Sequence, residues 1–526
     1  MDKHNVTMYK VLVVLVLICS VNSANILVLM SVPSPSHFLL IRPIVNNLAS
    51  RGHNVTVLSV NTDFDPPVNV SYIHLENTYN VLNGNGTVAN NILKRGEENP
   101  FQATMSFYRF GTLGCIGATS SKGWQTLQDY PDTFHFDLII YDFTTGPCVL
   151  GFLHKFNYPP LISITGFSIP QFSHYLVGGY KPSSTVPHFT MLYDSDMTFS
   201  QRMYNFVVQN FDSIYRQWVF LPRIQRLAQK ASNFPLPNLG ALEEHTQLML
   251  VNSNPVVDPA EILPQNVIAV GGLQIVQPKP LPEEIAKFIE NSRKGAVLFA
   301  MGTNFKSKMF TPERQAMFIE AFNQLPEYNF LWKFDDENLP MPASNNLMVT
   351  PWLPQNDILA HPNVKAFISH CGMLSTYEAS FHGVPIVGLP IYVDQHRNAQ
   401  RTVRAGVGVA LDMKTLSADK IRQALLQVLE DSQIQSKMKK RSALLKDQPE
   451  KPIDRALWWI EWVLRHPHSN HLRSPLLKLN YLAKNNLDVF SLLTTIIVIV
   501  FIAGYKCLKN TRKTNIKTLD TNKKLK

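Results

Sequence analysis

The chain alternates between short, continuously apolar runs and longer segments with helical periodicity. NILVLMS (Asn25–Ser31) and NVTVLSV (Asn54–Val60) flank one helical segment, which follows a loop that contains His37. A run without polar alternation is typical of a strand buried on both faces, so this order predicts strand, helix and parallel strand. HFDLIIYD (135–142) and PPLISITG (159–166) repeat the pattern.

The alternation restarts after a proline-rich segment, QIVQPKPLPEEI (274–285), which predicts an extended linker. Further apolar runs follow it, at 296–302, 328–334, 346–352, 364–369 and 384–390. We therefore predict an α/β protein in which two doubly wound parallel-sheet domains, 24–273 and 286–450, face a cleft. Residues 451–487 contain a tryptophan-rich helical segment that is expected to pack back against a domain.

Both ends of the chain carry membrane-targeting patterns. Lys3 and Lys10 precede a short apolar run and then small residues, which predicts a signal peptide over 1–23. Residues 488–505 are apolar and about long enough to cross a bilayer once, and a basic tail, 506–526, follows them. The chain is expected to be a single-pass type I membrane protein with lumenal domains.

A net charge of +10 can indicate a nucleic-acid partner, but most of this charge lies in the carboxyl-terminal tail. Residues 506–526 hold eight Lys or Arg against one Asp, so the domains are nearly neutral and no nucleic acid is expected. Three cysteines fall in the predicted lumenal part: Cys115, Cys148 and Cys371. Their odd number and their spacing predict neither a disulfide framework nor a metal site. Sequons stand at Asn54, Asn69 and Asn85.

Polar residues follow the apolar runs of the second half at positions that suit a nucleotide. His370 and Gly372 end the run Val364–Ser369 where a helix begins, and N–H groups and the helix dipole attract phosphate at such a point. A histidine at a strand end is more often structural, so this pair needs support from its neighbours.

Neighbouring positions supply that support in the order base, ribose, phosphate and sugar. An indole suits stacking on a base, and carboxylates and amides bind hydroxyl groups. The residues of these types are Trp352 for the base, Gln355 and Glu378 for ribose, and Asp394 and Gln395 for the sugar.

The segment WLPQNDILAHPNVKAFISHCGMLSTYEASFHGVPIVGLPIYVDQ (352–395) resembles the signature of the UDP-glycosyltransferase family. The likeness to its membrane-bound animal members extends over nearly the whole mature chain. It implies the GT-B fold, with an acceptor-binding first domain and a donor-binding second domain. It also implies uracil on Trp352, ribose at Gln355 and Glu378, sugar at Asp394 and Gln395, and diphosphate at His370, Gly372, Ser375 and Thr303.

The resemblance assigns catalysis to the first domain. His37 matches the catalytic histidine and Asp142 its partner, and both follow predicted strands at the edge that faces the cleft. Without the family pattern, His37 would more often be an ordinary exposed residue. A base accelerates attack by a hydroxyl about 10²–10⁴-fold, and attack opposite the departing UDP inverts the anomeric carbon. No metal and no cofactor beyond the UDP-sugar co-substrate is expected.

Two positions depart from the family pattern, and two alternatives remain open. Leu374 stands where many relatives carry asparagine, and Arg397 where the human-type pattern often has aspartate. A metal-dependent transferase would use an Asp-x-Asp pair, but Asp63–Asp65 and Asp194–Asp196 are expected to be solvated loop carboxylates. The second alternative is a catalytically silent relative that binds lipophiles or pairs with an active partner.

The resemblance also bears on substrates and location. It favours UDP-glucose as donor, with UDP-glucuronate second, small lipophilic hydroxyl compounds as acceptors, and possible homo-oligomers. Lys523 and Lys524 resemble a dilysine signal for the endoplasmic reticulum, with the tail in the cytoplasm.

Overall fold

The computed structural model describes residues 23–84, 96–179, 182–334, 345–467 and 469–524. Most of the predicted signal peptide, the sequon at Asn85 and the side chains of Lys523 and Lys524 lie outside this part. The chain divides into two compact units, 1–472 and 473–526, which are described separately.

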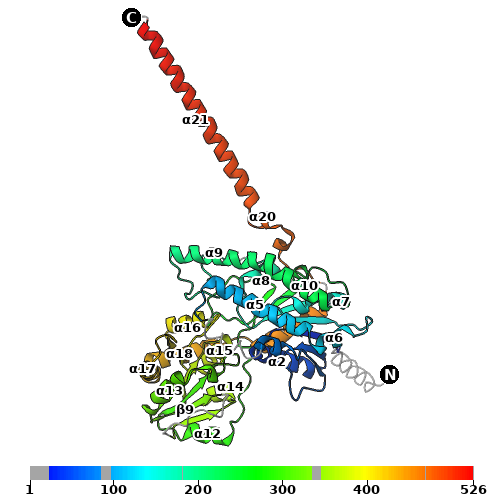
Figure 1. Cartoon of the computed structure of the whole chain (residues 1–526), viewed down its shortest axis with the longest axis vertical. Coiled ribbons are helices and arrows are strands. Elements are labelled where there is room, and N and C mark those ends of the chain that lie inside the picture. The colour runs from blue at the N-terminus through cyan, green and yellow to red at the C-terminus, as the bar shows by residue number, and fades with distance from the viewer. Residues whose placement is uncertain (1–22, 85–95, 180–181, 335–344, 468, 525–526) are drawn as a thin grey trace, which may run out of the picture. The chain divides into compact units, whose positions relative to one another are not determined.

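The first half of the larger unit, coloured from blue to green in Figure 1, forms a seven-stranded parallel sheet. The strand order is β3-β2-β1-β4-β5-β6-β7. The strands are β1 (Asn25–Met30), β2 (Asn54–Ser59), β3 (Val70–His74), β4 (Leu138–Asp142), β5 (Leu161–Thr165), β6 (Thr246–Val251) and β7 (Val267–Ala269). Val28 of β1 is level with Val57 of β2 and Ile140 of β4. The strand order reverses between β1 and β4, and ligands bind at such a switch point. We call this sheet and its helices the amino lobe.

Both faces of this sheet are covered, which explains the continuous apolar runs. On β1, Ile26, Val28 and Met30 pack towards α2 (Pro35–Ser50), whereas Leu27 and Leu29 pack towards α5 (Pro100–Thr119) and α10 (Leu221–Ala231). The remaining helices of the lobe are α3 (Thr78–Asn83), α6 (Lys122–Gln128), η2 (Cys148–Leu150), α7 (Gly151–Lys155), α8 (Gln171–Val177), α9 (Phe199–Tyr215), the π-helix η3 (Arg216–Phe220) and α11 (Leu239–Glu243).

A disulfide joins Cys115 of α5 to Cys148 of η2, with an S–S distance of 1.98 Å. The number and spacing of the lumenal cysteines predicted no disulfide framework, and this single disulfide was therefore not expected. An odd number requires only that one cysteine stays unpaired, and that residue is the buried Cys371.

The second half forms a six-stranded parallel sheet in the order β10-β9-β8-β11-β12-β13. Its strands are β8 (Gly295–Ala300), β9 (Tyr328–Lys333), β10 (Leu347–Thr350), β11 (Val364–Ser369), β12 (Ile386–Gly388) and β13 (Gly408–Ala410). The helices are α12 (Glu283–Glu290), η4 (Ser307–Met309), α13 (Pro312–Asn323), α14 (Gln355–Leu359), α15 (Met373–His382), α16 (Gln395–Arg404), α17 (Ala418–Glu430) and α18 (Ser432–Lys446). The order reverses between β8 and β11. We call this part the carboxyl lobe.

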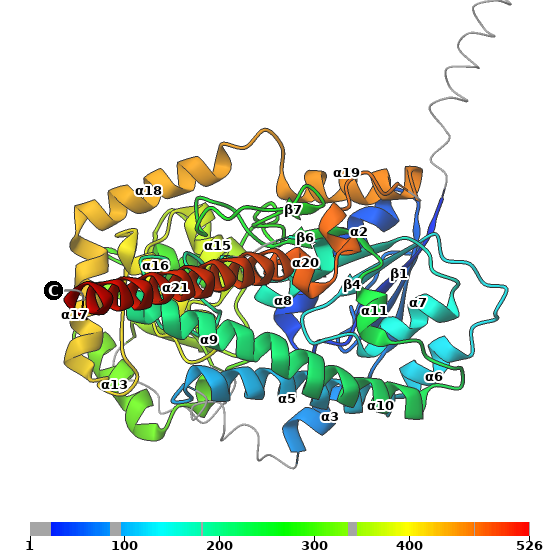
Figure 2. The ribbon, with the colours of Figure 1, turned by 90° about the horizontal axis from the view of Figure 1, so that it is seen from above.

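The helix α19 (Pro452–Arg465) returns the chain to the amino lobe. Its residues Ala456, Leu457 and Ile460 join the core that α2 forms with the first sheet. Arg51 reinforces the contact by an ion pair of 2.8 Å with Glu461. In Figure 2, α19 lies beside α2.

The smaller unit contains η5 (Pro475–Lys478), α20 (Tyr481–Lys484) and α21 (Leu487–Lys524). The 26 residues Leu487–Arg512 of α21 contain an 18-residue stretch whose mean hydropathy is 2.4 and whose side chains are not buried. At ~1.5 Å per residue they exceed the ~30 Å thickness of a bilayer core, so this helix is long and apolar enough to cross a membrane. The predicted span 488–505 lies within it.

Candidate active site

A cleft of about 1280 Å³ lies between the two lobes. Both sheets direct the carboxyl ends of their strands towards it, as open parallel sheets do at their ligand sites. Every predicted site residue lines this cleft except Asp142, which lies behind His37.

His37 is held in the first turn of α2 by a buried carboxylate. Its Nδ1 lies 2.7 Å from Oδ2 of Asp142, the last residue of β4. A carboxylate only accepts, so Nδ1 donates to it and Nε2 keeps its lone pair. The other oxygen of Asp142 accepts from the backbone N–H of Thr144 at 3.0 Å. Phe167 packs edge-on against the imidazole with ring centroids 5.4 Å apart. The ring is therefore fixed in one orientation and one tautomer.

His370 follows β11 and fits between two glycines. A Cβ on Gly302 would come within 2.6 Å of the imidazole, and one on Gly372 within 2.3 Å. Gly302 also has a φ of +81°, a left-handed conformation that favours glycine. Any side chain at either position would displace the ring.

The imidazole of His370 has a buried Nδ1 without a hydrogen-bond partner among the described residues. Burial and the nearby cation Lys333 lower the pKa of His370 to about 4. The ring is therefore neutral at physiological pH and can donate one hydrogen bond to an anion.

The helix α15 begins next to this histidine at Gly372, which caps it without a side-chain hydrogen bond. Its first N–H groups therefore remain available to an anion. Further along, Gln355 donates to Oε2 of Glu378 at 2.7 Å and to Ser375 at 3.1 Å. Burial raises the pKa of Glu378 to about 7. These three side chains form one polar surface that suits hydroxyl groups.

Trp352 presents a flat aromatic surface at the end of β10. Its side chain is 60% exposed, and the ammonium of Lys333 lies 4.9 Å from the ring centroid. Lys333 also donates to the backbone carbonyl of Gly302 at 3.0 Å. An exposed indole beside a cation is suited to stack on a planar ring that carries phosphate.

Asp394 and Gln395 line the cleft at the start of α16. Asn398 donates to Oδ2 of Asp394 at 2.7 Å, and burial raises the pKa of this carboxyl. The side-chain Oε1 of Gln395 accepts from the backbone N–H groups of Ile391 and Tyr392 at 2.9 and 3.2 Å. Thr303 lines the cleft in the loop after β8.

The sequence interpretation missed Lys333 and a contact across the cleft between Ser34 and Asn304. Lys333 ends β9, and the rule that ligands meet the carboxyl ends of strands would have found it. Asn304 donates to Oγ of Ser34 at 2.8 Å. No local pattern marks this pair, because its members are far apart in the sequence.

Leu374, one of the two departures, packs against the amino-lobe core that contains α2. Its backbone carbonyl accepts from Gln274 at 3.1 Å. The apolar side chain therefore contributes to the contact between the lobes.

The expectation that the Asp-x-Asp triplets are solvated is wrong for Asp63 and Asp194, whereas Asp65 and Asp196 are exposed. Asp63 accepts two hydrogen bonds from Arg42, at 2.5 and 2.9 Å. Asp194 is only 12% exposed and pairs with Arg401 of α16 at 3.3 Å.

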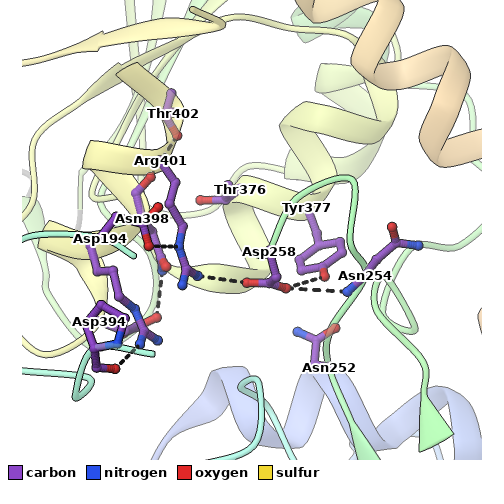
Figure 3. Close-up of polar contacts among 12 residues, drawn as sticks. Asp194, Asn252, Asn254, Asp258, Thr376, Tyr377, Asp394, Asn398, Arg401 and Thr402 are labelled. Carbon is purple, nitrogen blue, oxygen red and sulfur yellow. Dashed lines mark hydrogen bonds and ion pairs between the residues drawn. The ribbon is translucent and has the colours of Figure 1, made fainter. Parts of the chain in front are cut away.

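Arg401 also belongs to a cluster that joins the lobes (Figure 3). Its Nη1 donates to Asp258 at 3.0 Å, and the hydroxyl of Tyr377 donates to the same carboxylate at 2.7 Å. Within the described ranges, no group of three or more His, Cys, Asp or Glu side chains is arranged to hold a metal ion.

Comparisons with known proteins agree with this arrangement. A family model described as UDP-glucoronosyl and UDP-glucosyl transferase matches residues 26–522. The chain is 32% identical to UDP-glucosyltransferase 2 of Dactylopius coccus over 94% of each chain. It is 33% identical to UDP-glucuronosyltransferase 2B33 of Macaca mulatta, over 91% of this chain and 92% of that one.

Solved structures are similar at the level of the fold. A Phytolacca americana UGT2, complexed with UDP-2fluoro-glucose and pterostilbene, matches with a TM-score of 0.55 and 16% identity over 84% of this chain and 99% of that one. The glycotransferase of kitacinnamycin matches with a TM-score of 0.56 and 18% identity over 84% of this chain and 100% of that one. The predicted GT-B fold is confirmed. With the cleft described above, these matches establish that the chain belongs to the UDP-glycosyltransferase family, whose members transfer sugar from a UDP-sugar to an acceptor.

Proposed function

We propose that His37 is the general base of an inverting sugar transfer from a UDP-sugar to the hydroxyl group of a small lipophilic acceptor. The observation that carries this proposal is the 2.7 Å contact between His37 and Asp142 at the wall of the cleft. The carboxylate holds the tautomer in which Nε2 can take a proton, and it stabilises the imidazolium that results.

In the proposed step, the acceptor oxygen loses its proton to Nε2 of His37 and forms a bond to the anomeric carbon. The bond between that carbon and the UDP oxygen breaks, and UDP leaves with the electron pair. Negative charge then grows on the diphosphate. The N–H groups at the start of α15 and the neutral imidazole of His370 are positioned to stabilise it. No metal is required for this step.

The donor would extend along the carboxyl lobe. Uracil would stack on Trp352, and ribose would bind Gln355 and Glu378. His370, Gly372, Ser375 and Thr303 would bind the diphosphate, and Asp394 and Gln395 the sugar hydroxyls. All of these residues line one continuous cleft, and Lys333 adds a positive charge beside the base and phosphate positions.

We favour glucose over glucuronate as the transferred sugar. Asp394 and Gln395 suit neutral hydroxyl groups. The relative from Dactylopius coccus is a UDP-glucosyltransferase, although the macaque relative with similar identity is a UDP-glucuronosyltransferase. Competition between the two UDP-sugars in membranes that contain the enzyme tests this choice.

We further propose a location in the membrane of the endoplasmic reticulum, with both lobes in the lumen and the basic tail in the cytoplasm. The apolar helix Leu487–Arg512 and the disulfide between Cys115 and Cys148 support it, because disulfides persist in oxidising compartments. Protease protection of the lobes in sealed microsomes tests the topology.

Release of UDP with a phenol acceptor tests the catalytic assignment. We expect His37→Ala to lower kcat by about 10²–10⁴ while UDP binding, measured by calorimetry, stays unchanged. His361→Ala is the matched control, because His361 lies outside the lining of the cleft. A wild type without activity would instead favour the silent lipophile-binding or partner protein, and an active His37→Ala variant would refute the role of His37.

A further inference from the structure

Arg397, in the first turn of α16, is a buried cation whose donors are only partly used. The residue is only 4% exposed. Its Nη1 donates to the backbone carbonyl of Pro187 at 3.2 Å. Nε is buried and has no hydrogen-bond partner among the described residues. A guanidinium has five N–H donors, and leaving a buried one unpaired is unfavourable. The arrangement therefore lacks an acceptor.

Arg397 lines a side pocket of about 40 Å³ that adjoins the main cleft. The two cavities share lining residues from both lobes, namely Phe107, Thr144, Phe167, Phe189, Val393 and Asp394. One water molecule needs about 10–15 Å³ measured in this way, so the side pocket holds a small group and not a ring. Most of its lining is apolar or aromatic, so an anion there would be shielded from water.

The charged groups around Arg397 leave it without a close partner. Asp394 lines the same pocket, and Glu261 and Asp258 act on Arg397 electrostatically, as does the cation Arg401. Burial, followed by Arg401, lowers the pKa of Arg397 to about 10, so it stays charged at neutral pH. No ion pair joins Arg397 to a carboxylate of the described residues, whereas Arg401, one turn later, pairs with Asp258 at 3.0 Å.

We propose that Arg397 binds a carboxylate group of a bound substrate in this side pocket. A carboxylate matches the planar fork of a guanidinium and is small enough for the space. It would supply the hydrogen-bond acceptor that the buried Nε of Arg397 lacks among the described residues. The proposal rests on the proposed function, because it assumes that the cleft holds a UDP-sugar and an acceptor. Two substrates can supply the group: an acidic acceptor, or a uronic acid sugar of the donor.

The acceptor arm of the test uses matched phenols with UDP-glucose as donor. The probes are 4-hydroxybenzoate, 4-hydroxyphenylacetate and 3-(4-hydroxyphenyl)propionate, each compared with its carboxamide. A hydrogen-bonded ion pair in a buried site is expected to favour the acid of fitting length about 10–100-fold in kcat/KM. Arg397→Gln should remove this preference, and Arg397→Lys, which keeps the charge but not the fork, should retain part of it.

The donor arm compares UDP-glucuronate with UDP-glucose, with a neutral phenol as acceptor. If Arg397→Gln lowers the ratio of kcat/KM for the two donors about 10–100-fold and leaves the acceptor ratios unchanged, the carboxylate is that of the sugar. If only the kcat/KM ratio of the acid to its carboxamide falls, the carboxylate that Arg397 binds is that of the acceptor. Arg404→Gln is the control, because Arg404 lies on the same helix but outside the side pocket.

Ratios of two substrates separate recognition from a general loss of folded enzyme. If Arg397→Gln fails to fold, the Arg397→Lys variant and the preference of the wild type for the acid over its neutral counterpart still test the proposal. The proposal is refuted if the wild type prefers neither acid to its neutral partner, or if the variants lower all rates equally. Transfer of glucose to the carboxamides by the wild type supports the proposed function whatever happens at Arg397.

Discussion

Each lobe places a histidine beside the switch point of its sheet, and the two histidines have different chemistry. His37 follows β1 and His370 follows β11, each next to the switch point of its sheet and near the start of a helix. His37 is hydrogen-bonded to a carboxylate at 2.7 Å. Nδ1 of His370 has no hydrogen-bond partner in the described part of the chain, and its ring lies between two glycines with Lys333 nearby.

This difference shows that the partner, and not the position in the fold, decides what a histidine can do. A carboxylate fixes the tautomer and stabilises an imidazolium, which a base requires. Burial beside a cation keeps the other imidazole neutral, so it can only donate or accept a hydrogen bond. One lobe is therefore suited to move a proton and the other to hold an anion.

The largest expected effect comes from removing the charge behind His37. Asp142→Asn should lower kcat by about 10²–10⁴, because an amide no longer fixes the Nδ1–H tautomer or stabilises the imidazolium. The affinity for UDP should be unchanged in calorimetry, since Asp142 belongs to the amino lobe. An equal loss of UDP affinity would contradict the division of roles between the lobes.

The second effect comes from crowding His370. Gly302→Ala should weaken UDP binding about 10–100-fold, because the new Cβ would lie 2.6 Å from the imidazole and displace it. Gly383→Ala is a close control: its φ is +76°, similar to +81° at Gly302, but the atom nearest to its Cβ is 3.4 Å away. Both variants should lose ~1–2 kcal/mol of stability, but only Gly302→Ala should lose affinity for UDP. Equal UDP affinities would count against His370 as an anion ligand.

The third effect is on the pH dependence of stability. The pKa of His370 is about 4 in the folded protein, against 6.5 ordinarily, so unfolding takes up a proton between these values. The stability from neutral His370 is fully present above pH 6.5 and is lost as the pH falls through 4. His370→Asn should therefore flatten the decline of the thermal unfolding midpoint between pH 6.5 and 4. An unchanged decline would show that other groups cause it.

The smallest expected effect comes from Lys333. Lys333→Met should weaken UDP binding about 2–10-fold, because it removes one partly exposed positive charge near the ring of Trp352 and the phosphate position. Lys294→Met is the control, since Lys294 pairs with Glu327 outside the lining of the cleft. A loss as large as that of Gly302→Ala would mean that Lys333 and not His370 dominates the anion site.

The sequence predicted the two parallel sheets because a strand that is buried on both faces leaves a local mark. β1, β4, β8 and β11 are such strands, and each was predicted. β3, β7 and β13 were missed because each contains exposed or half-buried positions and so leaves a weaker mark. β6 was also missed, although its burial is nearly continuous. The order of strands and helices then predicted which edge of each sheet faces the cleft.

The family resemblance predicted Asp142 as the partner of His37, although these residues are 105 positions apart and no pattern of their own marks the pair. Other contacts followed only from the tertiary structure, such as the disulfide between Cys115 and Cys148. Asp194 pairs with Arg401 of the other lobe and is not a solvated carboxylate.

By itself, the sequence determined the type of sheet, its repetition and the residue types that follow its strands, because these depend on burial and spacing along the chain. The pairing of His37 with Asp142, the fit of His370 between two glycines and the incomplete partners of Arg397 were decided by the tertiary structure. They arise where segments that are distant in the sequence pack together, and no local pattern specifies which side chains then come within hydrogen-bonding distance.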